Sequence, residues 1–168
     1  MIKKNLLTIL GFKIVWLSCV LGELYINSLF GFFAGIIFLL FFLINEKKIL
    51  LVIKTILLFS LIGYFFDSLL SFFGFYKINA QINFLFLPVW FLVLWPCFCC
   101  LFINVLTFLK NKKLIATIIG TIFGPLSYYA GVSVGLASFS SIIAFYLMSF
   151  FWALMMFCYS KYFSKKYV

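Results

Sequence analysis

Long apolar stretches separated by short polar clusters form the dominant pattern of this chain. An α-helix needs about 20 apolar residues to cross the hydrocarbon core of a bilayer. Lysine clusters and short polar turns divide the sequence into six stretches of about this length. We expect an all-α integral membrane bundle of six transmembrane helices that form one domain over residues 1–168, with no soluble domain. The predicted helices cover about residues 6–22, 25–44, 49–73, 87–109, 114–134 and 140–162.

The composition supports a membrane protein and excludes several other classes. Hydrophobic residues make up 67% of the chain and charged residues only 10%, whereas about 25% of a soluble domain is charged. Too few polar side chains remain to cover a soluble fold of this size. A water-soluble enzyme, a disordered chain and a secreted disulfide scaffold are therefore excluded.

The lysines predict how the bundle is oriented. All thirteen basic residues are lysines, and they give a net charge of +10 with three acidic residues. Ten lysines lie on the side of the chain termini, whereas the opposite loops contain only Lys77. The positive-inside rule then places both termini in the cytoplasm. Anionic lipids of the bilayer are the expected partner of these lysines, and we expect no nucleic-acid binding because no arginine and no soluble domain are present.

Residue usage also narrows the location and the chemistry. Abundant Phe, Ile, Lys and Asn without Arg are typical of an AT-rich bacterial genome, so we expect a multi-pass protein of a bacterial inner membrane. The chain contains no His, which removes His-based catalysis and His metal ligands. We expect no metal site, no cofactor and no catalytic residue. Cys97 and Cys100 have CxxC spacing, but in the middle of an apolar helix they are interpreted as small apolar residues.

Two acidic residues lie inside predicted helices at matching depths. At 1.5 Å per residue, Asp67 lies about 27 Å along the third helix and Glu23 about 26 Å along the first. Ionisable groups in a membrane segment are candidate functional residues. Asp67 could be a binding carboxylate in an outward-facing pocket or a hydrogen-bonding anchor between helices, and Glu23 could be an interfacial turn residue. Small and polar residues share the helical face of Asp67, which should face protein: Ser60, Gly63, Ser71 and Gly74.

The fifth predicted helix carries a stripe of small residues at steps of three and four. Such stripes let helix backbones approach closely, so we expect this helix to be central in the bundle. Pro125 removes a backbone hydrogen bond and predicts a kink. The residues expected to pack against neighbouring helices are Gly120, Gly124, Pro125, Gly131 and Gly135.

These patterns predict one candidate ligand-binding site in the outer half of the bundle. We expect five side chains to converge there: Asp67, Glu23, Trp90, Ser127 and Tyr128. A carboxyl group at this depth needs a Tyr or Ser hydrogen-bond partner unless it is protonated. Lys13 shares a helical face with Trp16, Val20 and Glu23, and it either extends to the cytoplasmic headgroups or contacts Asn104.

Several motifs resemble an uncharacterised family of small multi-pass bacterial inner-membrane proteins, a domain of unknown function. The most specific motif is G-P-L-S-Y-Y-A-G over residues 124–131. Weaker matches lie around Trp16, Gly63 with Asp67, and Pro88 with Trp90. The resemblance implies a membrane protein without an established activity. It implies no role for Lys13 or the cysteine cluster, where this sequence departs from the pattern.

Three functions remain open at this point. The leading hypothesis is a non-enzymatic protein that binds or moves a small or lipidic ligand through an outward-facing pocket. The first alternative is a structural or partner subunit of a membrane complex, similar to a transporter substrate-binding component or a cell-shape scaffold. The second alternative is an intramembrane lipid-modifying enzyme that uses Asp67.

Overall fold

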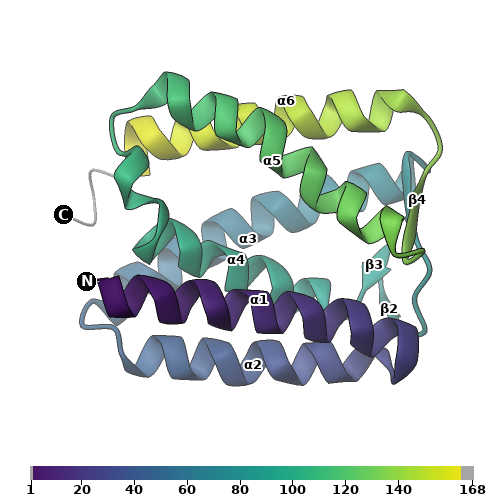
Figure 1. The fold of residues 1–168 in the computed structure, drawn as a ribbon, viewed down its shortest axis with the longest axis horizontal. Coiled ribbons are helices and arrows are strands. Elements are labelled where there is room, and N and C mark those ends of the chain that lie inside the picture. Colours follow the sequence, from purple (N-terminus) through teal and green to yellow (C-terminus); the bar gives the residue numbers. More distant parts are fainter. Residues whose placement is uncertain (1, 164–168) are drawn as a thin grey trace.

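In the computed structural model, which describes residues 2–163, the chain forms a helical bundle with short strands at one end (Figure 1). The α-helices are α1 (Ile2–Tyr25), α2 (Ser28–Ile44), α3 (Ile49–Phe72), α4 (Phe91–Asn104), α5 (Lys113–Ser133) and α6 (Ile142–Cys158). A 3-10 turn, η1 (Leu106–Leu109), follows α4, and a π-helical turn, η2 (Tyr159–Phe163), follows α6. The strands are β1 (Tyr76–Ile78), β2 (Asn83–Phe84), β3 (Leu87–Pro88) and β4 (Ala137–Phe139).

Four of these helices indicate a membrane protein. α1, α3, α5 and α6 with its π-helical extension are long and apolar enough to cross a membrane. α2 has 17 residues and α4 has 14. A 14-residue helix is about 21 Å long, which is shorter than the hydrocarbon core of about 30 Å.

The prediction of one continuous helix over residues 87–109 is wrong. The polar connection after α3 folds back on itself, so that Leu87 and Pro88 pair with Phe84 and Asn83 as strands β3 and β2. α4 therefore begins only at Phe91. At its other end, the chain tightens into η1 before α5.

A second small sheet joins the ends of α3 and α5. Each helix is followed by a glycine with positive φ, Gly74 at 72° and Gly135 at 79°, a conformation that glycine adopts without a steric penalty. The strands after these glycines pair antiparallel, with Tyr76 of β1 opposite Phe139 of β4. The all-α prediction missed both sheets because strands of two or three residues leave no detectable alternation in the sequence.

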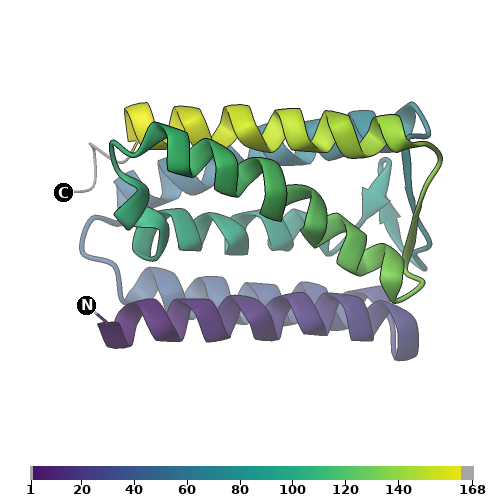
Figure 2. The same cartoon turned by 45° about the horizontal axis from the view of Figure 1, so that its top comes forward.

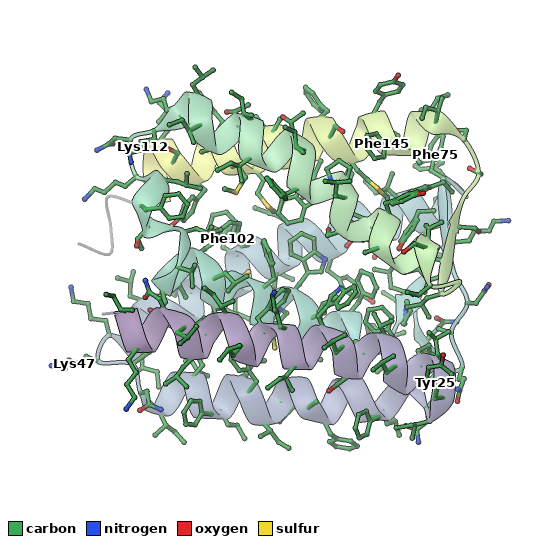
Figure 3. All side chains as sticks on the ribbon, in the orientation of Figure 1. Tyr25, Lys47, Phe75, Phe102, Lys112 and Phe145 are labelled. Atoms are coloured by element: carbon green, nitrogen blue, oxygen red, sulfur yellow. The ribbon has the colours of Figure 1, made fainter. Side chains whose placement is uncertain are left out.

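The two ends of the bundle differ in charge. α1 begins and η2 ends at the same end, which we call the lysine end, and the strands lie at the opposite strand end (Figures 1 and 2). Lys47 and Lys112 project from the lysine end, whereas Tyr25 and Phe75 lie at the strand end (Figure 3). Lys77 lies in β1. The lysine clusters and Lys77 thus lie at opposite ends of the bundle, as the sequence pattern predicted.

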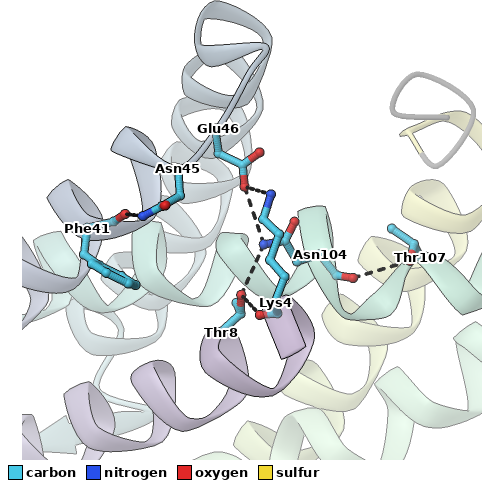
Figure 4. Close-up of polar contacts among 7 residues, drawn as sticks. All are labelled: Lys4, Thr8, Phe41, Asn45, Glu46, Asn104 and Thr107. Atoms are coloured by element: carbon cyan, nitrogen blue, oxygen red, sulfur yellow. Dashed lines mark hydrogen bonds and ion pairs between the residues drawn. The ribbon is translucent and has the colours of Figure 1, made fainter. Parts of the chain in front are cut away.

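A polar cluster fixes three segments at the lysine end (Figure 4). Lys4 of α1 forms an ion pair of 2.7 Å with Glu46 in the turn after α2. Asn104 of α4 donates from Nδ2 to the Thr8 hydroxyl at 3.1 Å and to Glu46 at 3.5 Å. Asn104 is therefore engaged with these residues, and the contact with Lys13 considered from the sequence is not formed.

α4, not α5, is the central helix of the bundle. It lies between the other helices in Figure 1 and packs against α1, α2 and α3. Its cysteines Cys97, Cys99 and Cys100 are fully buried. These small side chains permit close packing, since Cys97 Sγ lies 3.5 Å from the Gly35 carbonyl oxygen of α2. The expectation of a central fifth helix was wrong because its small-residue stripe mainly serves one neighbour, α6.

The predicted packing residues of α5 have different surroundings. An added Cβ at Gly120 or Gly124 would collide with Trp152 of α6, so both glycines lie directly against that helix. Pro125 is buried within α5, which continues to Ser133 and diverges from α6 toward the strand end (Figures 1 and 2). Gly135 lies beyond the helix, and a Cβ there would have nothing within 4 Å. It is a turn residue and not the packing residue that the stripe predicted.

Candidate functional site

Asp67 is buried near the strand end of α3 and joins three helices. Its side chain is 1% exposed. Oδ2 accepts a hydrogen bond of 2.7 Å from Trp95 Nε1 of α4, and Oδ1 accepts one of 2.7 Å from the Tyr128 hydroxyl of α5. Both oxygens of the carboxyl group therefore have a donor from another helix, one of them a tyrosine hydroxyl of the kind expected from the sequence.

Glycine and aromatic residues keep the Asp67 partners in place. Gly63 lies one helical turn before Asp67, and an added Cβ there would collide with the Trp95 indole ring. The Tyr76 ring of β1 packs edge-on against the Tyr128 ring at 5.5 Å. Burial and the Asp67 carboxylate raise the pKa of Tyr76, so its hydroxyl is neutral at physiological pH.

Glu23 is buried in the last turn of α1 and holds the polar connection between β1 and β3. Oε2 accepts hydrogen bonds from the Ser28 hydroxyl at 2.6 Å and from Trp90 Nε1 at 2.8 Å. Oε1 accepts one of 2.6 Å from the backbone N–H of Gln81. Gln81 Nε2 also donates to the Glu23 carbonyl oxygen, and Ile82 N–H donates to the Ser28 hydroxyl. The interpretation of Glu23 as an interfacial turn residue was wrong, since it is 5% exposed and α1 extends to Tyr25.

The two carboxyl groups form separate sites, and each accepts a hydrogen bond from a tryptophan at the strand end of α4. Trp90 caps the start of α4 and binds Glu23, and Trp95 lies one helical turn into the helix and binds Asp67. Among the described residues, no hydrogen bond or shared partner links the two acids. The strand end therefore contains two indole–carboxylate pairs side by side along one helix.

A cavity of about 340 Å³ lies beside Asp67. Four of the five predicted site residues line it: Asp67, Trp90, Ser127 and Tyr128. Glu23 does not line the cavity and reaches it only through Trp90. The structure thus brings four of the five residues to one cavity, and Glu23, the fifth, is separated from the cavity by Trp90.

Aromatic residues dominate the cavity wall, and most were missed by the sequence analysis. All four tryptophans of the chain line it, together with Phe12, Phe91, Phe98 and Tyr76. The tryptophans come from α1, α4 and α6, and no spacing within one helix connects them. No local signal in the sequence groups them, because they come together only when the helices pack against one another.

The cavity lies between α1 and α5, which flank α4 (Figure 1). Lys13 of α1 and Ser127 of α5 are its exposed polar lining residues. At its strand end the lining residues Tyr76 and Leu136 are buried, and Ile78 of β1 is partly exposed. The fully exposed polar lining residues thus lie on the sides of two helices, which in a membrane would face lipid.

The wall offers little reactive chemistry. Asp67, Lys13 and Ser127 are its charged or hydroxyl-bearing residues besides the tyrosines. The Ser127 hydroxyl donates to the Gly124 carbonyl oxygen at 2.6 Å. Between residues 2 and 163, no group of three or more Cys, Asp or Glu side chains is placed to hold a metal ion.

The helices and the cavity together define a helical membrane protein with an aromatic cavity beside a buried carboxyl group. The chain belongs to the family described as "Protein of unknown function (DUF2878)", whose model matches residues 5–158. This match confirms the resemblance to an uncharacterised family. No curated protein and no solved structure matches the chain.

Proposed function

We propose that this protein binds an apolar, chain-like ligand of the membrane in the cavity between α1 and α5. The observation that carries the proposal is the lining: all four tryptophans surround a space of about 340 Å³ whose exposed edges lie on the sides of two helices. A ligand dissolved in the bilayer enters such a space sideways, between helices. The proposal keeps the expected lipidic ligand and replaces the outward opening with a lateral one.

The size of the cavity supports a ligand with one hydrocarbon chain. Sites for small molecules span about 300–1,000 Å³, and this cavity of about 340 Å³ lies near the lower limit. A diacyl lipid is too large to be enclosed. We infer that one chain lies along the tryptophans and contacts Phe98.

Asp67 has a positioning role in this proposal. Its two oxygens already accept hydrogen bonds from Trp95 and Tyr128, two residues of the cavity wall. A carboxyl group with both oxygens engaged fixes the orientation of the two aromatic rings. The proposal therefore needs no reaction at Asp67.

Tryptophan fluorescence tests this proposal directly, because every tryptophan lines the cavity. We expect a brominated long-chain alcohol to quench the fluorescence of the purified protein in detergent micelles with saturable dependence on ligand concentration. Ser127→Phe fills the cavity edge and should weaken binding about tenfold, equivalent to about 1.4 kcal/mol.

Ser133→Phe is the matched control for this substitution. Ser133 is exposed on the same helix, donates a similar hydrogen bond three residues back to Ala130, and does not line the cavity. The Ser133→Phe variant should bind the brominated alcohol with the same affinity as the wild type. Equal loss in both variants, or quenching without saturation, would refute the cavity as a binding site. A stoichiometric partner protein that co-purifies without lipid would favour the subunit hypothesis instead.

We also propose that the lysine end faces the cytoplasm of a bacterium and that all six helices lie in its inner membrane. The support is the separation of the lysines: Lys77 lies in β1, which pairs with β4 at the strand end, whereas Lys47 and Lys112 of the clusters lie at the other end (Figure 3). Single cysteines at positions 77 and 112, introduced into a chain whose native cysteines are replaced by alanine, test the orientation. A membrane-impermeant thiol reagent added to intact cells should label position 77 and not position 112. Labelling of both or of position 112 alone would refute this topology.

A further inference from the structure

Lys13 has an unusual position for a charged residue. It lies in the middle of α1, about 17 Å from the first residue of the helix and about 18 Å from the last. The flexible lysine side chain spans only part of either distance. Its exposed side chain also lines the aromatic cavity. A charge at this depth needs a partner of opposite sign or access to water.

Among the described residues, no acidic side chain forms an ion pair with Lys13. The sequence contains three acidic residues, and each is engaged elsewhere. Glu46 pairs with Lys4, and Asp67 accepts from Trp95 and Tyr128. The two oxygens of Glu23 accept from Ser28, Trp90 and Gln81. Lys13 thus has no ion-pair partner among these side chains, and an anionic ligand can supply one.

We propose that Lys13 binds the anionic head of a single-chain amphiphile whose hydrocarbon chain occupies the cavity. This inference rests on the proposed function and adds the head-group chemistry to it. The chain lies among the tryptophans, and the head lies at the exposed edge of α1, where Lys13 meets it. The ligand stays anchored at this edge while its tail is enclosed.

The single charge of Lys13 favours a carboxylate head. Lys13 is the one cationic residue among the described residues that line the cavity, and the acidic lining residue, Asp67, accepts hydrogen bonds from Trp95 and Tyr128 with its two oxygens. Lys13 can therefore pair with one negative charge of a ligand. A carboxylate carries one charge, whereas a phosphate monoester carries about −1.5 to −2 at pH 7 and would leave an excess charge in the membrane. A long-chain fatty acid anion is the simplest ligand of this class.

The experiment compares two ligands with the same brominated chain, a fatty acid and the corresponding fatty alcohol, by tryptophan quenching of the full-length protein. The wild type should bind the acid about tenfold more tightly than the alcohol, because a hydrogen bond to a charged group is worth more than one to a neutral group. Lys13→Gln should remove this preference, because the acid then loses its charged partner and binds about as weakly as the alcohol. Lys13→Arg should retain the preference.

Lys54→Gln is the matched control, since Lys54 is an exposed lysine inside α3 that does not line the cavity. It should preserve the wild-type preference for the acid. An unchanged preference in Lys13→Gln would overturn the proposal and assign Lys13 to the lipid headgroups. A single-chain phosphate monoester or a zwitterionic single-chain phospholipid that displaces the acid with higher affinity would overturn the carboxylate assignment.

The same measurements separate this inference from the proposed function. If acid and alcohol bind the wild type equally and saturably, the cavity binds a chain and the role of Lys13 is refuted. If neither ligand quenches the fluorescence, the proposed function itself is refuted.

Discussion

Glu23 and Asp67 are two buried carboxyl groups that accept an indole N–H from the same helix, yet their other partners differ. Glu23 also binds a backbone amide and a serine that holds the next amide of the polar connection. Asp67 binds only side chains, and one side of it borders a cavity. The Glu23 site therefore fixes the path of the main chain, whereas the Asp67 site fixes the shape of a wall.

This difference shows how the surroundings of a buried acid indicate its role. A carboxylate that accepts from backbone amides of a distant loop is a structural anchor, because its loss leaves main-chain groups unpaired. A carboxylate that orients aromatic rings around an open space contributes to a binding site. Five substitutions test this distinction, and they are given from the largest expected effect to the smallest.

Glu23→Ala should have the largest effect on stability. It leaves three donors without their acceptor, those of Ser28, Trp90 and Gln81. An unsatisfied buried donor costs about 1–3 kcal/mol, so we expect a loss of about 3 kcal/mol or more in the free energy of unfolding, measured by denaturation in detergent.

Hydrogen exchange gives the Glu23 prediction a local readout. The backbone amide of Gln81 should exchange faster in Glu23→Ala than in the wild type. Glu46→Ala is the control, because Glu46 forms an ion pair at the lysine end with the half-exposed Lys4, and such pairs contribute about 1 kcal/mol or less. Unchanged protection of the Gln81 amide in Glu23→Ala would show that Glu23 does not anchor the connection.

Trp95→Phe should destabilise more than Trp90→Phe. Each change removes an indole donor to a carboxyl group, and a hydrogen bond to a charged group contributes about 1.5–3 kcal/mol. Glu23 keeps two further donors after the loss of Trp90, whereas Asp67 keeps only Tyr128. We expect a loss of about 2 kcal/mol for Trp95→Phe and about 1 kcal/mol for Trp90→Phe in the same denaturation assay. The reverse order would contradict the comparison of the two sites.

Asp67→Asn should lower the free energy of unfolding by about 1 kcal/mol, less than Trp95→Phe. The amide oxygen still accepts one hydrogen bond, and water in the adjacent cavity can satisfy the other donor. Exchange of the Gln81 amide should stay at the wild-type rate. Faster exchange there would show that the two sites are coupled, and would contradict their separation.

Ser68→Ala should have the smallest effect. The buried Ser68 hydroxyl, next to Asp67 in the sequence, has no hydrogen-bond partner among the described residues. Replacing a buried hydroxyl that makes no hydrogen bond removes its desolvation cost. We expect unchanged or slightly increased stability, and a clear loss would reveal a partner for this hydroxyl.

The sequence by itself determined the membrane class, the approximate helices and the separation of the lysines. These features follow from local patterns: apolar length fixes a helix in lipid, and lysine clusters mark its ends. The small polar face around Asp67 also indicated that this acid faces protein. In the structure it accepts from Trp95 and Tyr128.

Only the tertiary structure decided which helix is central and where the acids find their partners. The bond from Gln81 to Glu23 joins residues 58 positions apart, and the tryptophans of the cavity come from three helices. The pairing of β1 with β4 joins segments that follow different helices. Helical periodicity specifies which face of a helix is buried and does not specify against which neighbour it packs. That choice depends on how all the side chains fit together, because the lipid around a membrane bundle is as apolar as its core and gives the helices no hydrophobic preference for one neighbour over another.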